Sequence, residues 1–296
     1  MTDVYLNTLL LFIFGTFLGS FLNLVSDRSV KGGKIIIGHS KCDFCGKILR
    51  PLNLIPIVSF LWQRGKCSNC KKSLARIYVF SEVVAGMLLV LAAYLSKFSI
   101  FGPFDLTSAL GFAFLVVVFS FYEILVLTDL KYLLIPDKVV LPAIGFVALF
   151  HVITTSVNLW DYRIRLQNDE FGQYLFRLGY FEDQMLDVAR SLGTNFASAI
   201  VIALLFLFLV WVTRGRGMGG GDIRLALLVG LVNPFPHNLL AIFLAFFTGA
   251  IISIMFVVAG KKTLKSVVPF GPFLILGSLI SLVWGGVILH WYLYLL

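Results

Sequence analysis

The hydrophobic residues of this chain are gathered in long blocks separated by short polar segments. A helix needs about 20 apolar residues to cross a hydrocarbon core about 30 Å thick. Blocks of that length with few charged residues are typical of membrane-spanning helices. Seven blocks qualify, each with at most one acidic residue: 4–25, 78–96, 107–127, 139–157, 195–212, 238–259 and 269–289.

An eighth apolar segment, 223–232, is only 10 residues long and is followed by the sequence Asn-Pro-Phe-Pro. It either crosses the membrane, with a helix that begins in the preceding glycine-rich run, or enters and returns on the same side. Lys and Arg concentrate on the cytoplasmic side of membrane proteins. Of the 24 Lys and Arg residues, 19 fall in segments 26–76, 128–138, 213–224 and 260–268, which favours eight crossings with both termini outside.

The pattern therefore predicts an all-α polytopic membrane protein of about eight transmembrane helices. The first helix lies in 1–26, a small cytoplasmic loop domain in 27–76, and a helical membrane domain in 77–296. The one sizeable outer loop, 158–194, is polar with scattered aromatic residues. Such a sequence suits either a solvated loop or an amphipathic helix on the membrane surface.

Composition narrows the class of protein further. With 59% hydrophobic and 13% charged residues, a disordered or collagen-like chain is excluded and a soluble globular fold is disfavoured. The net charge of +9 does not call for nucleic acid as a partner, because membrane orientation explains most of the excess of basic residues. Membrane lipid is the expected surrounding.

All four cysteines lie in the predicted loop domain, as two Cys-x-x-Cys pairs: Cys42, Cys45, Cys67 and Cys70. The pairs are separated by 21 residues, and two such pairs can form a tetrahedral thiolate site for zinc. Four thiolates leave no open position on the metal, so the predicted role is structural. Free thiols or two disulfides are the alternatives, and a reducing cytosol disfavours the disulfides.

Acidic residues inside or beside membrane spans are energetically expensive and are candidates for function. Asp129 follows the block 107–127, and Asp222 closes a glycine-rich run before 223–232. In the predicted topology both lie at the cytoplasmic edge of the membrane. Two carboxyl groups that share one proton can activate a water and protonate a leaving group, as in aspartic proteases. The alternative is that each aspartate caps a helix and pairs with Lys131 or Arg224.

Several motifs together resemble the type IV prepilin peptidases, a family of bacterial membrane aspartyl proteases that carry a Gly-x-Gly-Asp motif. They occur in the order of that family and cover most of the chain outside 158–194. The matching segments are 15–28, 53–59, 64–67 with the double Cys-x-x-Cys loop, 129–137, 217–225 and 269–272.

The resemblance implies that Asp129 and Asp222 are the catalytic pair of an endopeptidase. It implies that the enzyme removes the basic leader from type IV prepilin-like precursors at the bacterial inner membrane. It also implies that enzymes with the zinc loop methylate the new N-terminal residue, with S-adenosylmethionine as the methyl donor. The zinc loop and both aspartates would then face the cytoplasm.

Other residues are weaker candidates for these activities. Methyl transfer is assigned to Arg64, Gly65, Lys66 and Glu82, although the first three also suit a solvated basic turn and Glu82 suits a helix contact. Support of the protease site is assigned to Gly219, Gly221 and Asp137. A proton-coupled transporter with a cytoplasmic zinc loop is the competing function. A transporter should have its acidic residues near the bilayer midplane and an internal repeat in its sequence. Asp129 and Asp222 instead lie at one predicted membrane edge, and the sequence shows no repeat, so this function is disfavoured.

Overall fold

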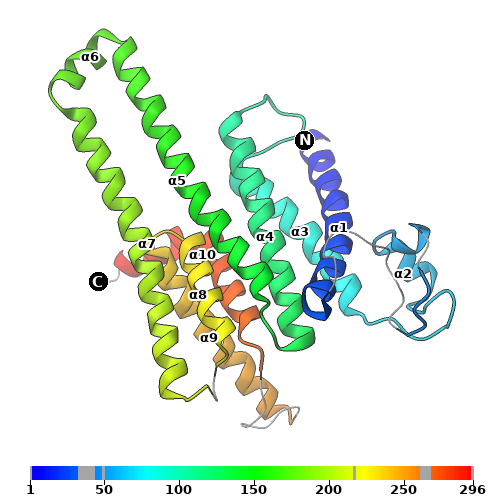
Figure 1. Ribbon diagram of the computed structural model, residues 1–296. Coiled ribbons are helices and arrows are strands. Elements are labelled where there is room, and N and C mark those ends of the chain that lie inside the picture. The colour runs from blue at the N-terminus through cyan, green and yellow to red at the C-terminus, as the bar shows by residue number, and fades with distance from the viewer. Residues whose placement is uncertain (1, 33–43, 49–50, 216–217, 261–267, 295–296) are drawn as a thin grey trace. The chain divides into compact units, whose positions relative to one another are not determined.

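The computed structural model describes residues 2–32, 44–48, 51–215, 218–260 and 268–294, and this part of the chain is helical (Figure 1). It divides into two compact units, Met1–Val139 and Val140–Leu296. Seven helices within the described residues are long and apolar enough to span a membrane. The predicted all-α, multi-pass architecture is thereby confirmed.

Three long helices build the first unit: α1 (Thr2–Lys31), α3 (Ile77–Ser96) and α4 (Leu106–Tyr132). Glycines allow α1 and α3 to pack closely, because a Cβ atom at Gly15 would lie 2.6 Å from the Cα atom of Gly86. One turn further along α1, a Cβ atom at Gly19 would lie 2.6 Å from the Cβ atom of Ala85. Small residues at such spacing are how helices approach one another in lipid, where hydrophobic burial supplies little driving force.

Two short helices, η1 (Pro51–Leu54) and α2 (Val58–Trp62), lie in the loop between α1 and α3. An isolated antiparallel bridge joins Lys66 to Ser73 after α2. The predicted loop domain is therefore built from turns and short helices, with few residues that could form a core of their own.

The second unit holds most of α5 (Asp137–Asn168), α6 (Glu170–Arg177), α7 (Tyr180–Val212), α8 (Gly220–Val232), α9 (His237–Val258) and α10 (Gly271–Tyr294). Helices α5 and α7 continue well beyond the predicted apolar blocks, and Figure 1 shows α6 joining their ends. Segment 158–194 is therefore mostly helical and not an irregular loop, and a position on the membrane surface stays a prediction. Helix α5 has 32 residues and is about 48 Å long, which exceeds the hydrocarbon core. A hydrophobicity pattern shows where a helix can contact lipid and gives no signal for where a helix ends in water.

Helix α8 corresponds to the short eighth segment and has 13 residues, or about 20 Å of helix. It packs against α7 through Gly230, where a Cβ atom would lie 2.9 Å from the Cα atom of Ala199. Buried amides fix the far end of α8: Asn233 donates to Ser278 Oγ of α10 at 2.7 Å, and Asn238 of α9 donates to Ser198 Oγ of α7 at 2.6 Å. Helix α8 is shorter than the about 20 residues that a crossing needs, so the eighth crossing stays a prediction.

We expect Gly15→Ala to lower the thermal stability of the protein in detergent. The added methyl group meets main-chain atoms 2.6 and 2.7 Å away, so α1 and α3 must separate, at a cost of about 1–3 kcal/mol. Gly111→Ala in α4 is the matched control, since its Cβ atom would meet Ser96 at an ordinary 3.5 Å. Equal unfolding temperatures for the two variants would contradict the close contact.

Candidate functional site

Asp129 lies in the last turn of α4, and only 6% of its surface is exposed. Its carbonyl oxygen accepts a hydrogen bond from Leu133 N–H at 2.9 Å, and Leu133 adopts a left-handed conformation that ends the helix. The neighbouring Thr128 is fully buried. Asp129 is therefore a buried carboxyl group near a helix end. The sequence pattern placed it just after the apolar block 107–127, whereas α4 continues to Tyr132.

Asp222 is the third residue of α8, and 9% of its surface is exposed. Its carboxylate accepts a hydrogen bond from the N–H of Gly219 at 3.0 Å, while its own N–H donates to the Gly219 carbonyl at 3.1 Å. The N-terminus of a helix favours a negative charge, which partly offsets the cost of burying one there. Asp222 therefore does cap a helix, as its alternative reading proposed, and is also held in a fixed orientation.

Asp129 belongs to the first unit and Asp222 to the second. Of the weaker candidates, Gly219 is the N-cap of α8 and Gly221 is its second residue. Asp137 is the first residue of α5, so it lies in the turn where an acidic side chain stabilises the helix dipole.

Three of the four predicted zinc ligands come together in the first unit. The Sγ atoms of Cys45, Cys67 and Cys70 all lie within 4.8 Å of one another, and the three cysteines are not in disulfides. Sharp turns on either side depend on Gly46 and Gly65, which have φ angles of +68° and +67°. Cys42, the fourth predicted ligand, lies outside the described residues.

The methyl-transfer candidates Arg64, Gly65 and Lys66 form one turn directly after α2. Gly65 N–H donates to the Phe60 carbonyl at 2.9 Å, and the Phe60 ring lies 3.0 Å from where a Cβ atom of Gly65 would be. Main-chain bonds and ring packing therefore fix the turn, while the side chains of Arg64 and Lys66 are exposed. An exposed pair of cations remains available to an anionic ligand.

Glu82, the fourth methyl-transfer candidate, connects α3 to the loop in front of α2. Its buried carboxylate accepts a hydrogen bond from Ile57 N–H at 2.7 Å. Ile57 has φ +59° and ψ −54°, a conformation that β-branched residues rarely adopt, and its neighbours Pro56 and Val58 are joined by a main-chain hydrogen bond across it. The structure therefore places Glu82 against a strained turn before α2, and the other three candidates after α2.

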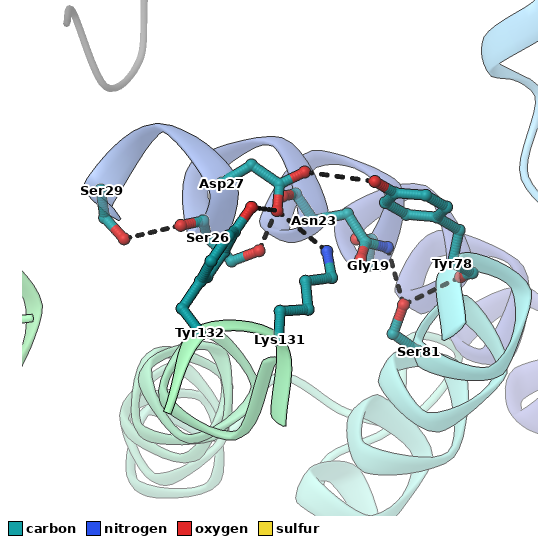
Figure 2. A network of polar contacts seen from close by, with 9 residues as sticks. All are labelled: Gly19, Asn23, Ser26, Asp27, Ser29, Tyr78, Ser81, Lys131 and Tyr132. Carbon is teal, nitrogen blue, oxygen red and sulfur yellow. Dashed lines mark hydrogen bonds and ion pairs between the residues drawn. The ribbon is translucent and has the colours of Figure 1, made fainter. Parts of the chain in front are cut away.

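The sequence reasoning missed a cluster of polar side chains around Asp27, which is drawn in Figure 2. Its carboxylate accepts hydrogen bonds from Tyr132 and from Lys131, each at 3.0 Å, and from Tyr78 at 3.4 Å. Lys131, considered above as a partner for Asp129, thus forms its ion pair with Asp27. The available signal was an acidic residue one turn after Asn23 at the end of a span.

A fourth buried acid, Glu123, lies in the middle of α4. Its Oε1 atom has no hydrogen-bond partner among the described residues. The side chain lines a cavity of about 10 Å³ together with Leu18, Phe119 and Ser120, which is about the space that one water molecule needs.

Comparison with known protein families gives two matches. Residues 13–96 match the Bacterial Peptidase A24 N-terminal domain, and residues 174–254 match the Type IV leader peptidase family. Asp222 lies within the second match, and Asp129 lies between the two.

Curated relatives named prepilin leader peptidase/N-methyltransferase match along almost the whole chain. The protein from Bacillus subtilis (strain 168) is 28% identical, with 96% of this chain and 97% of the relative covered. The protein from Pseudomonas aeruginosa is 27% identical, with 95% and 91% covered. The protein from Aeromonas hydrophila is 24% identical, with 96% and 93% covered. No solved structure matches the chain.

We expect Glu82→Ala to loosen the loop around α2, because the N–H of Ile57 loses its acceptor and the strained turn loses its support. Limited proteolysis should then cut between residues 55 and 66 several-fold faster. Glu82→Gln is the matched control, since its side-chain oxygen can still accept the same hydrogen bond. Equal protection of the loop in both variants would contradict this role.

Proposed function

We propose that this chain is a prepilin leader peptidase and N-methyltransferase, because it matches the Type IV leader peptidase family over residues 174–254 and relatives of that name along almost its whole length. It removes the leader from type IV prepilin-like precursors and methylates the new N-terminal residue. It is a multi-pass protein of the bacterial membrane. Neither the described residues nor the names of the relatives favour the competing transporter function.

We propose that Asp129 and Asp222 are the two catalytic carboxyl groups. The observation that carries this assignment is that both are buried aspartates at helix ends, one in each unit. Carboxyl groups that are shielded from water and held at fixed positions are suited to general acid–base chemistry. One ionised carboxylate takes a proton from water as the water oxygen attacks the peptide carbonyl carbon. The other, protonated carboxyl group gives its proton to the peptide nitrogen, and the bond between that nitrogen and the carbonyl carbon then breaks, which leaves a carboxylic acid and a free amine.

Local geometry supports Gly219 and Gly221 as helpers of this reaction. The N–H of Gly219 orients the Asp222 carboxylate at 3.0 Å. Neither glycine carries a side chain, so an extended peptide could approach the backbone there. Asp137, at the start of α5, is proposed as a further acidic residue beside the site.

We propose that the active site and the zinc loop face the cytoplasm. The excess of basic residues in segments 26–76, 128–138 and 213–224 supports this orientation. Within the first unit, the contact of Asp27 with Tyr78 and Lys131 joins the end of α1, the start of α3 and the end of α4. The loop and Asp129 are therefore attached to the same end of that unit. The peptide bond after a basic leader and before an apolar segment would lie at this membrane edge.

We propose that segment 27–76 is a zinc-binding domain. Zinc bonds to thiolate at about 2.3 Å, so tetrahedral ligands lie about 3.8 Å apart. Three Sγ atoms within 4.8 Å of one another suit such a site, and Cys42 would supply the fourth ligand. A bound zinc ion would stabilise a loop that has few apolar residues of its own.

Methyl transfer would use S-adenosylmethionine as the methyl donor. When bound, this donor would supply a methyl group for the nitrogen of the new N-terminus. The exposed cations Arg64 and Lys66, on the turn that Gly65 forms, are proposed to bind the carboxylate of the donor. Glu82 is proposed to support this loop through Ile57.

Asp129→Asn and Asp222→Asn should each abolish cleavage of a purified prepilin-like precursor in detergent or lipid, with a loss of at least about 10³-fold. An amide of the same shape cannot exchange the proton that the reaction needs. Cleavage is measured by the mobility and mass of the product. The matched control is Asp187→Asn, which changes an exposed aspartate paired with Arg190 and should cleave at the wild-type rate. Full activity in either catalytic variant would overturn the assignment.

Cys67→Ser should reduce the zinc content from one ion per chain to a small fraction, because the site loses its buried thiolate. Elemental analysis of the purified protein measures the metal. Ser73→Ala, a change at a nearby exposed residue, should retain the zinc. Full zinc content in Cys67→Ser would contradict the proposed site. Cys67→Ser should also lose more methylation activity than cleavage activity, because the metal stabilises the loop that is proposed to bind the methyl donor.

A further inference from the structure

Asp27, near the end of α1, gathers donors from two other helices (Figure 2). Its Oδ1 atom accepts from Lys131 Nζ and from Tyr132 Oη, both at 3.0 Å. Its Oδ2 atom accepts from Tyr78 Oη of α3 at 3.4 Å. The Lys131 ammonium also lies 4.5 Å from the centre of the Tyr78 ring. One carboxylate therefore joins α1, α3 and α4 at one end of the unit.

This cluster is shielded from solvent to an extent that surface ion pairs are not. The side chains of Lys131 and Asp27 are 12% and 17% exposed. By comparison, the ion pair of Asp161 with Arg165 has side chains that are 54% and 78% exposed. Exposed pairs contribute little, whereas charge-assisted hydrogen bonds in shielded surroundings are among the stronger ones. The contacts of Asp27 can therefore fix the positions of the Lys131 and Tyr132 side chains.

The part that they bind is the last turn of α4, which contains Asp129. Both ends of a helix tend to fray because their outermost main-chain groups lack partners within the helix, and this turn is one of the two ends of α4. Two consecutive side chains of the turn, Lys131 and Tyr132, are held on one oxygen atom of Asp27. Tyr132 is three residues after Asp129, so both lie on neighbouring parts of one helix face. A rotation of the turn that released Tyr132 would also move the Asp129 carboxyl group.

The turn of α1 that precedes Asp27 is itself held in place by contacts with α3. One turn earlier on α1, the Asn23 amide donates to Ser81 Oγ at 2.7 Å and to the Gly19 carbonyl at 3.1 Å. Gly19 is also the point at which α1 and α3 approach closely. The position of Asp27 is therefore determined by the packing of α1 on α3, and its contacts transmit that position to α4.

We infer that Asp27 is a positioning residue for cleavage, which holds the last turn of α4 and with it the catalytic carboxyl group of Asp129. The inference rests on the proposed protease function. A positioning role predicts a loss in kcat with little change in KM, because the substrate still binds while the reacting groups are misaligned. A role in folding alone would leave kcat unchanged for each folded molecule.

The test measures kcat and KM for precursor cleavage with the full-length protein in lipid, per folded molecule. Asp27→Asn keeps the shape of the side chain and removes its charge. It should lower kcat about tenfold and leave KM within about twofold. Lys131→Met should lower kcat similarly, and the double variant should be no slower than Asp27→Asn, because both changes act through one contact. Asp161→Asn, in the exposed ion pair, is the matched control and should match the wild type.

A kcat for Asp27→Asn within twofold of the wild type would overturn the inference. The inference would also be overturned if the fold loss of kcat in the double variant equalled the product of the losses in Asp27→Asn and Lys131→Met, because the two changes would then act independently. If Asp27→Asn fails to fold, Tyr132→Phe replaces it, since this change removes a single hydroxyl donor and should also lower kcat. Cleavage by Asp129→Asn in the same assay would overturn the proposed function instead. Active wild type, inactive Asp129→Asn and unimpaired Asp27→Asn would reject the positioning role alone.

Discussion

The cost of burying carboxyl groups in an apolar helical protein is the constraint on which the rest of this structure depends. The described part of the chain contains four buried acids: Glu82, Glu123, Asp129 and Asp222. An ionised carboxylate in such surroundings is strongly disfavoured unless polar groups are fixed around it. Main-chain N–H groups meet this requirement at two of them, from Ile57 to Glu82 and from Gly219 to Asp222.

Fixed polar groups require helices that do not slide, and small residues provide the necessary contacts. In lipid, helices associate through close packing and interhelical hydrogen bonds. Gly15 and Gly19 bring α1 onto α3 in the first unit, while Asn233 and Asn238 join α8, α9, α10 and α7 in the second. The same principle explains the Asp27 cluster, which fixes the end of α4 by polar contacts where hydrophobic burial cannot.

The sequence alone predicted the parts of the fold that follow from composition along the chain. The seven spans were found because a membrane helix needs a long apolar block, and the cysteine cluster because metal ligation imposes a short spacing. The extensions of α5 and α7 were missed because their outer turns are polar. Two sets of contacts were missed: those of Asp27 with α3 and α4, and that of Glu82 with Ile57. They depend on how the helices are rotated, and they link residues that are 25 to 105 positions apart in the sequence. Asp129 and Asp222 were identified from their places beside apolar blocks, and their joint action is our proposal.

The most direct test of that joint action is the binding of an uncleavable precursor analogue that carries a hydroxyl group at the scissile position. Two aspartates acting on one peptide bond should bind this hydroxyl in place of the attacking water. The wild-type protein should then bind it at least about 100-fold more tightly than a matched analogue without the hydroxyl. Asp129→Asn and Asp222→Asn should each lose that preference while still binding the matched analogue. A preference that survives in either folded variant would contradict the central claim.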